Sequence, residues 1–266
     1  MKIKNILVLS AFVVLATACA KAPAPPAVPV ENKAADNTSK INDILAAPDK
    51  TAEFADALAI IEYNSHAEDL DFHVELDAPA WEWIAILDPS GNKVFEVSHS
   101  GSIGEQGLTS LFFESAELPF DVLPYDEFLA RFPEGEYTLV GETLEGEALM
   151  SLMTLNHNIP DPPVITSLGE DPLVPMYAVS IAWEHVTSPA GVEVERYQVV
   201  VFPVDPEEGQ DAIALDIDLT FEVPADLNHV EIPAAWLMSG EQYQYEVIAM
   251  EADGNQTLTV GFFTTE

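Results

Sequence analysis

The sequence predicts an all-β protein with two β-sandwich domains in tandem. Between Asp69 and Asp77 every even position is apolar and every odd position is polar, which is the period of a strand with one buried face. Short strand-like segments separated by turn sequences then follow one another to the C-terminus. Hydrophobic residues make up 48% of the 266 residues, which is enough to form a core. After a leader and a tail are removed, the length fits two domains of about 100–150 residues each.

Residues 1–18 have the features of an export signal. Lys2 and Lys4 precede an apolar run from Ile6 to Ala18, which suits a signal-peptide core but is too short, at ~1.5 Å per residue, to cross a bilayer as a helix. The sequence LATAC at residues 15–19 resembles a bacterial lipobox, so Cys19 is the expected lipid attachment site. Ala16 stands where that motif usually has Leu, and ordinary cleavage after Ala18 or Ala20 is the alternative.

Residues 19–54 are expected to form a flexible stalk. The segment from Lys21 to about Thr51 is rich in Pro, Ala and small polar residues, which favour extended and solvated backbone. A short helix is expected between Asp43 and Leu58. A lipid on Cys19 and this stalk would hold the folded part away from the membrane.

Residues 55–160 are expected to form an Ig-like β-sandwich. The segments 81–87 and 93–97 flank Asp88-Pro89-Ser90-Gly91-Asn92, a turn sequence that predicts a β-hairpin. Further strands are expected at 111–114, 137–143 and 148–155. A short helix is expected at 125–132, between Pro124 and Pro133, where it would close one end of the sandwich.

Residues 161–266 are expected to form a second sandwich. Pro160, Pro162 and Pro163 lack backbone donors and therefore mark the boundary between the two domains. Roughly seven strands in about 105 residues is the size of an Ig-like domain. The clearest of these strands are expected at 179–183, 197–202, 230–232, 243–249 and 258–262.

The C-terminal part, about 163–266, resembles a fibronectin type III domain. It has Pro162-Pro163 at its start, Trp183 on the second strand, Tyr197 on the third, and the sequence LMSGEQY ending at Tyr243 before the sixth. The resemblance implies that Trp183 fills the core and that Tyr243 forms a tyrosine corner. The sequence PEGEY ending at Tyr137 is similar to the same corner. The N-terminal half resembles the uncharacterised part of exported bacterial lipoproteins that end in such a module.

Composition excludes a protein that grips nucleic acid through phosphate contacts. The chain has 9 Lys and Arg against 46 Asp and Glu, a formal net charge of −37, so no basic patch can form. Its single cysteine excludes an intramolecular disulfide and a zinc site built on paired thiolates. Ser98-His99-Ser100 is the one sequence that suggests a hydrolase, and it lacks a nucleophile-elbow motif. We therefore predict that the protein is not an enzyme.

Calcium is the candidate metal, although no cofactor is required by the sequence. Asp69 and Asp71 lie two residues apart on one predicted strand face, ~6.5–7 Å from each other. Asp205 and Glu207 lie in a second acidic segment. Neither group has the oxygen spacing of an EF-hand, and a solvated strand face is the favoured interpretation of the stripe from Asp69 to Asp77.

Trp81 and Trp83 are expected on the same face of one strand. If exposed, they would form an aromatic platform for a sugar ring or a protein partner. Burial beneath the helix at 125–132 is the favoured alternative.

The predicted function is that of a non-enzymatic exported lipoprotein, a binding or spacer module at the bacterial cell envelope, periplasmic or on the cell surface. Its partners would be the membrane, through the lipid, and an unidentified protein or glycan, but not nucleic acid. The alternatives are a carbohydrate-binding accessory protein that uses Trp81 and Trp83, and a hydrolase built around His99.

The charge predicts a stability that depends on salt. Without residues 1–18 the chain keeps 7 Lys and Arg and 46 Asp and Glu, so 7 − 46 = −39. Salt screens this self-repulsion over ~8 Å or less, so we expect a higher Tm in about 0.5 M salt than in dilute buffer. Equal melting temperatures would contradict the prediction.

Overall fold

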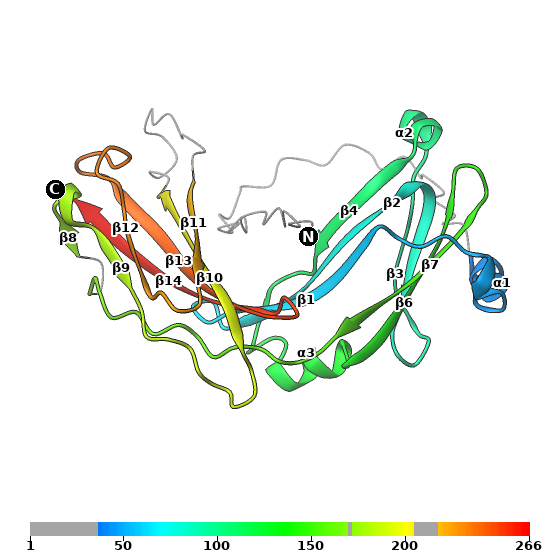
Figure 1. The fold of residues 1–266 in the computed structure, drawn as a ribbon, viewed down its shortest axis with the longest axis horizontal. Coiled ribbons are helices and arrows are strands. Elements are labelled where there is room, and N and C mark those ends of the chain that lie inside the picture. Colours follow the sequence, from blue (N-terminus) through cyan, green and yellow to red (C-terminus); the bar gives the residue numbers. More distant parts are fainter. Residues whose placement is uncertain (1–36, 170–171, 205–217) are drawn as a thin grey trace, which may run out of the picture. The chain divides into compact units, whose positions relative to one another are not determined.

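The computed structural model describes residues 37–169, 172–204 and 218–266 (Figure 1). The predicted signal at 1–18, Cys19, Asp205 and Glu207 lie outside the described residues. The helices are α1 (Thr38–Leu45), α2 (Gly101–Gln106) and α3 (Tyr125–Arg131), with 3-10 helices η1 (Pro48–Lys50) and η2 (Met176–Ala178). The strands are β1 (Asp56–Asn64), β2 (Asp69–Leu87), β3 (Lys93–Ser98), β4 (Leu108–Glu114), β5 (Leu118–Pro119), β6 (Gly135–Thr143), β7 (Ala148–Leu155), β8 (Leu173–Val174), β9 (Ser180–Ala182), β10 (Val194–Pro203), β11 (Leu219–Pro224), β12 (His229–Glu231), β13 (Gln242–Glu251) and β14 (Gln256–Thr265).

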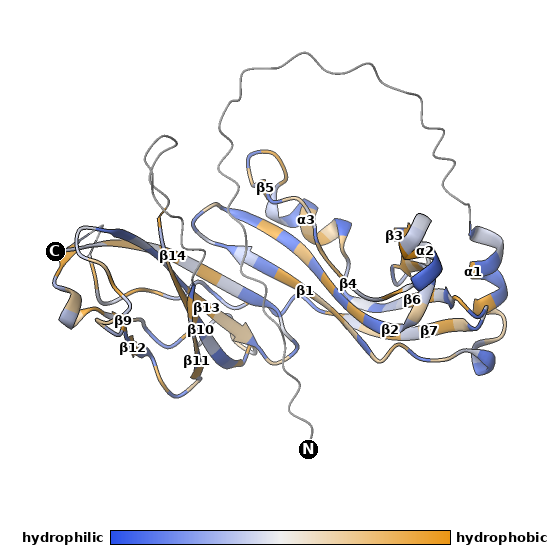
Figure 2. Cartoon of the chain, turned by 90° about the horizontal axis from the view of Figure 1, so that it is seen from above, coloured by the Kyte–Doolittle hydropathy of each residue, from blue (hydrophilic) through white to orange (hydrophobic). Residues whose placement is uncertain are grey.

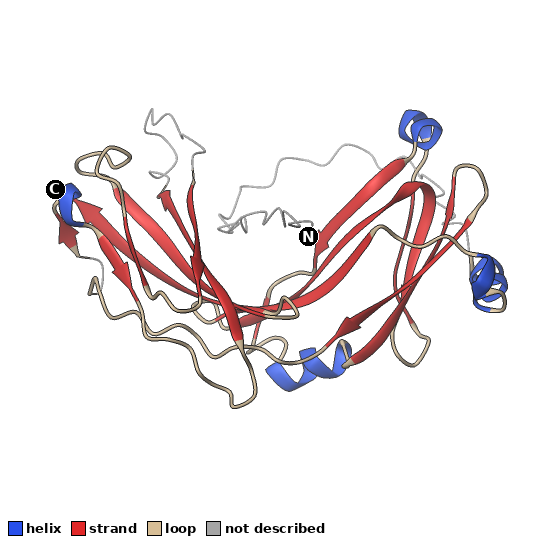
Figure 3. Cartoon of the chain, in the orientation of Figure 1, coloured by secondary structure: helices blue, strands red, loops and turns tan. Residues whose placement is uncertain are grey.

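The described chain is an all-β protein, as the periodicity predicted (Figure 3). Most strands belong to one hydrogen-bonded sheet with the order β11-β10-β13-β14-β1-β2-β6-β7, while β12 and β9 form a second, two-stranded sheet. Strands β1 and β14 pair in parallel, Glu62 opposite Gln256. This pairing links strands from the two predicted domain ranges through backbone hydrogen bonds.

The N-terminal strands are organised around β2, which is 19 residues long. Its first part, Asp69–Asp77, pairs with β1 and β4, and its second part pairs with β3 and β6. Pro79 lies between the two parts and has no N–H to donate, and the ladder to β4 is irregular between Asp77 and Trp81. One strand therefore serves two sets of partners.

The first hydrophobic core lies on one face of β1 and β2. Ile61, Phe72 and Val74 are buried in it together with Tyr137 of β6 and Phe128 of α3. Figure 2 shows hydrophobic and hydrophilic residues alternating along β2, and in its first part, Asp69–Asp77, only the face with Leu70, Phe72 and Val74 belongs to this core. The predicted hairpin is confirmed, since β2 pairs with β3 and the Asp88 side chain accepts hydrogen bonds from the N–H groups of Ser90 and Asn92, both at 2.8 Å.

The predicted stalk is wrong over its last part. Instead of extended chain up to residue 54 and a helix within 43–58, the structure has α1 at Thr38–Leu45. Ile41 and Ile44 are buried against Trp83 and Val140. Two apolar residues three apart lie on one face of a helix, but the partner that buries them is distant in sequence and cannot be recognised from local composition.

The C-terminal strands enclose a second core with a fibronectin type III-like arrangement. Trp183 and Phe263 are completely buried in it, and the Trp183 ring packs against Tyr197 with the ring centroids 5.2 Å apart. The buried Tyr243 side chain accepts a hydrogen bond at its hydroxyl oxygen from the N–H of Met238, at 2.8 Å. In the first core, the hydroxyl of Tyr137 donates to the carbonyl of Pro133 at 2.9 Å.

The hydrogen bond of Tyr243 gives a test of this arrangement. Tyr243→Phe leaves the Met238 N–H without its partner, which we expect to lower the free energy of unfolding by about 1–3 kcal/mol in urea titrations. Tyr177→Phe is the matched control, because Tyr177 is 85% exposed, and its stability should equal that of the wild type. Equal stability of both variants would contradict the proposed role of the hydroxyl.

Candidate functional site

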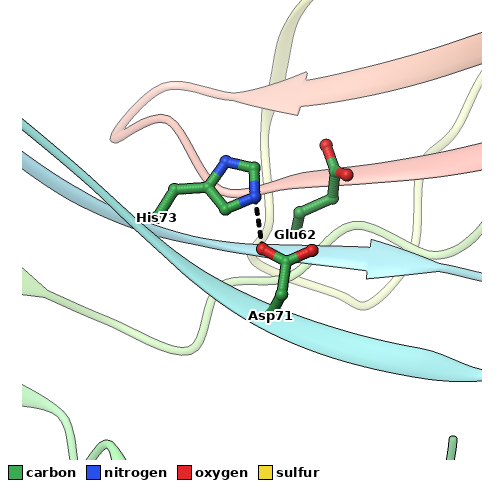
Figure 4. A group of neighbouring side chains, drawn as sticks. All are labelled: Glu62, Asp71 and His73. Atoms are coloured by element: carbon green, nitrogen blue, oxygen red, sulfur yellow. Dashed lines mark ion pairs between the residues drawn. The ribbon is translucent and has the colours of Figure 1, made fainter. Parts of the chain in front are cut away.

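Three ionisable side chains from neighbouring strands lie together: Glu62 from β1, and Asp71 and His73 from β2 (Figure 4). One ligand-type atom of each lies within 4.8 Å of the others. The antiparallel register places Glu62 directly opposite Asp71, and residues two apart on a strand share a face. The cluster therefore occupies the face of β1 and β2 that points away from the first core.

The side chains of the cluster contact one another and two further strands. The Nε2 atom of His73 contacts Oδ1 of Asp71 and lies 3.8 Å from Oε2 of Glu114 on β4. The side-chain amide of Gln256 on β14 donates a hydrogen bond to Oε2 of Glu62. Strands β1, β2, β4 and β14 thus all contribute polar atoms to this site.

The carboxylates of this site are buried, which corrects the prediction of a solvated strand face. Glu62 is 4% exposed, Asp69 is 4% exposed and Asp71 is 1% exposed. Flanking strands cover them: Gln256 lies beside Glu62 in the ladder, and the Phe112 ring of β4 lies 5.9 Å from the His73 ring. An alternating pattern identifies two faces of a strand but does not show what covers the polar one.

Burial and the repulsion of neighbouring acids raise the pKa values of Glu62, Asp69 and Glu117. Burial raises the pKa of Glu62 to about 8, and the charge of Asp71 adds to this effect. The same two causes raise the pKa of Asp69 to about 6 and that of Glu117 to about 7. Such shifts arise where charged groups lack water and opposite charges.

The pKa of His73 is raised although its side chain is mostly buried. Burial alone would lower the pKa of its imidazole, but the hydrogen bond and charge of Asp71, together with Glu62 and Glu114, raise that pKa to about 9. The ring is therefore positively charged at neutral pH when nothing else is bound, and it contacts Asp71 directly.

Of the two predicted calcium ligands on β2, only Asp71 belongs to the three-residue cluster. Asp71 joins the cluster with Glu62 and His73, and Asp69 lies two residues away on the same face of β2. The Oδ1 atom of Asp69 is buried without a hydrogen-bond partner. Glu62 was not predicted, because a single acid within an apolar strand becomes significant only when the β1–β2 register is known.

Trp81 and Trp83 are both buried, as the favoured interpretation predicted, so the alternative of an exposed aromatic platform is wrong. They are 0% and 2% exposed, and they belong to different hydrophobic clusters. The register of β2 against β6 shifts between the two residues, and such a bulge ends the simple alternation of faces. Trp83 is covered by α1, not by the predicted helix near residues 125–132.

His99, the residue on which a hydrolase was considered, contacts backbone. Its Nε2 atom contacts the carbonyl oxygen of Trp81, and its ring packs on the Trp81 ring with the centroids 5.1 Å apart. The glycine-bearing segment after it forms α2. This arrangement gives His99 a structural contact between β2 and the segment after β3.

No protein-family model matches the chain, and no curated protein matches it. Several solved structures are similar to it, among them the following three. A tetra-tandem repeat from the extending region of a large adhesion protein has 14% identity and a TM-score of 0.27, over 79% of this chain and 50% of that chain. Chicken CNTN1 FN1–FN3 domains have 12% identity and a TM-score of 0.30, over 80% of this chain and 67% of that chain.

The BSP domain of a biofilm associated protein has 15% identity and a TM-score of 0.24, over 84% of this chain and 31% of that chain. The chain thus spans half of the first of these structures and less than a third of the last. The fibronectin type III-like fold of the C-terminal half rests on its own strand order, on buried Trp183 and on the Tyr243 hydrogen bond.

Within residues 37–169, 172–204 and 218–266, the helices are all too short or too polar to cross a membrane.

The raised pKa values predict that stability falls as pH rises. A buried carboxyl with a raised pKa keeps its proton in the folded protein at pH values where the same carboxyl in the unfolded chain has lost it. The free energy of unfolding therefore decreases as the pH rises from about 5 to about 8. Glu62, Asp69, Glu117 and Glu246 act in this sense. His73 acts in the same sense. Its contribution to the free energy of unfolding is complete below pH 6.5, the ordinary pKa of histidine, and is lost as the pH rises through about 9, the pKa of His73 in the folded protein.

Burial raises the pKa of Glu246 to about 7. Thermal melting in EDTA should therefore give a higher Tm near pH 5.5, below this pKa, than near pH 8.5, above it. Glu246→Gln should make this dependence shallower, because an amide does not titrate. Glu231→Gln, at an exposed position on β12, should leave it unchanged. A Tm that rises with pH would contradict the prediction.

Proposed function

We propose that this protein is an exported bacterial lipoprotein whose β-sandwich domains act as a non-enzymatic binding or spacer module at the cell envelope. The observation that carries the proposal is the lipobox-like sequence LATAC at residues 15–19, which follows a signal-like apolar run and precedes a Pro/Ala-rich segment and a β-rich body. A cysteine in this position is the acceptor expected for a lipid.

The start of the folded part supports a tethered arrangement. Helix α1 begins at Thr38 and packs onto the N-terminal strands through Ile41 and Ile44. Residues 19–36 separate the proposed lipid site from the first described residue, Asn37, and 18 residues can reach at most about 65 Å. The proposed tether would allow the β-sandwich domains to stand away from the membrane surface.

The charge supports the same arrangement. A net charge of 7 − 46 = −39 without residues 1–18 repels the protein from anionic membrane surfaces and favours a solvated surface. The lipid would then provide the attachment, and electrostatic repulsion would keep the domains from lying on the bilayer.

The contacts of the histidines support a role without catalysis. His99 contacts the Trp81 carbonyl oxygen, and Nε2 of His157 lies 2.8 Å from the carbonyl oxygen of Phe132. Both rings thus hold loops to neighbouring backbone. A general base would instead need to reach the hydroxyl or water that it activates.

Cys19→Ala tests the lipid anchor. In a bacterial host that processes lipoproteins, the full chain should incorporate a labelled fatty acid and sediment with the membrane fraction. The C19A variant should lose the label and appear in the soluble exported fraction, because the acceptor thiol is gone.

Lys33→Ala is the matched control, since it changes the same Pro/Ala-rich segment without removing the thiol, and it should behave as the wild type. Label on the C19A variant, or an unlabelled wild-type chain in the soluble fraction, would refute the anchor.

A further inference from the structure

We propose that Glu62, Asp71 and His73 form a binding site for a divalent transition-metal ion of the Zn²⁺ class, with Asp69 as an adjacent carboxylate. The inference goes beyond the proposed envelope function and does not depend on lipid attachment. It rests on the geometry of the cluster, on the nature of its donor atoms, and on a buried oxygen that has no partner.

The geometry can accommodate one ion. The three ligand-type atoms lie within 4.8 Å of one another, so a single ion between them can approach the ~2.0–2.2 Å at which Zn²⁺ contacts imidazole nitrogen and carboxylate oxygen after small side-chain movements. The three ligands come from paired strands with a defined register, and such elements position a site more rigidly than loops do.

The donor set indicates the class of ion. Calcium prefers six to eight oxygen ligands, whereas an imidazole nitrogen with two carboxylates suits Zn²⁺ and related ions. The structure therefore changes the predicted ion, because the alternation placed His73 on the same strand face as Asp71 but did not show that Glu62 lies beside them.

Asp69 provides an independent sign of a missing ligand. Its side chain is 4% exposed, and Oδ1 has no hydrogen-bond partner. It lies on the face of β2 that carries Asp71 and His73, two residues from Asp71. A buried carboxylate oxygen without a donor is costly unless a cation or a proton compensates it.

A cation would allow both facing carboxyls to ionise. Glu62 and Asp71 lie directly opposite each other in the ladder, where two negative charges would destabilise the sheet without one. The ion pairs of Lys40, Lys93 and Arg196 in the described residues are all made with other acids. A divalent metal ion between Glu62 and Asp71 would supply two positive charges at this position.

An ion has a route into this site. The side chain of His73 is 13% exposed and that of Glu114 beside it is 39% exposed, so one side of the cluster faces solvent. Glu62 and Asp71 form the buried side. Gln256, which donates to Glu62, would orient that carboxylate as outer partners of metal ligands do.

The test uses the full chain without a histidine tag, purified in detergent and stripped with EDTA. Titration calorimetry with ZnCl₂ should show one bound ion per chain, and free Zn²⁺ at about 100-fold its Kd should raise Tm by about 5 °C or more. Ca²⁺ at the same concentration should give a much smaller shift.

Asp71→Asn and His73→Gln each remove a ligand while keeping the side-chain size, so both should weaken Zn²⁺ binding at least about tenfold and abolish the Tm shift. Without metal, D71N loses the contact between Asp71 and His73 and should be less stable than the wild type, so the Zn²⁺-induced shift of each variant is measured from its own Tm in EDTA. This comparison separates loss of a ligand from loss of folding.

Two variants serve as controls. Glu75→Gln changes the next acid on the same face of β2, and His229→Gln changes an exposed histidine. Both should keep the full Zn²⁺-induced shift. The proposal is overturned if Zn²⁺ gives no shift, if D71N and H73Q respond as the wild type does, or if Ca²⁺ alone stabilises the protein.

Discussion

The long strand β2 is the element on which the N-terminal half depends. Strands β1, β3, β4, β5 and β6 all form hydrogen bonds to it, so the placement of each of them follows from its course. Its two parts have different neighbours on either side of Pro79, where the missing N–H interrupts regular pairing. A change in its register would exchange buried and exposed side chains on several strands at once.

The first part of β2 has one apolar face and one acidic face, and both are largely buried. One face of its first part contributes Leu70, Phe72 and Val74 to the core, and the other face carries Asp69, Asp71 and His73. Burial of the apolar face stabilises the sheet, whereas burial of the acidic face costs free energy unless protons or a cation neutralise it. The acids and the histidine thus form a region whose stability depends on what the solution supplies.

Local sequence patterns predicted many elements correctly. Turn residues around Gly91 identified the β2–β3 hairpin, and the prolines at 124 and 133 identified α3. Period-two alternation likewise identified the first part of β2, whereas β1 and β11 were not among the predicted strands. These features depend on residues close in sequence, so they can be recognised without the fold.

The errors have a common cause. The burial of Trp83 under α1 and the shift of register between Trp81 and Trp83 both depend on segments far away in the chain. The cover over the acidic face depends on β4 and β14 in the same way. Alternation gives the relative orientation of neighbouring side chains but does not identify their partners.

By itself, therefore, the order of residues determined the strand-rich class, the hairpin, the short helix α3 and the excess of negative charge, because these follow from backbone preferences and composition. Only the tertiary structure decided that Glu62 lies opposite Asp71 and that this polar face is buried. Register between strands and cover by distant strands are long-range properties, and no local pattern encodes them.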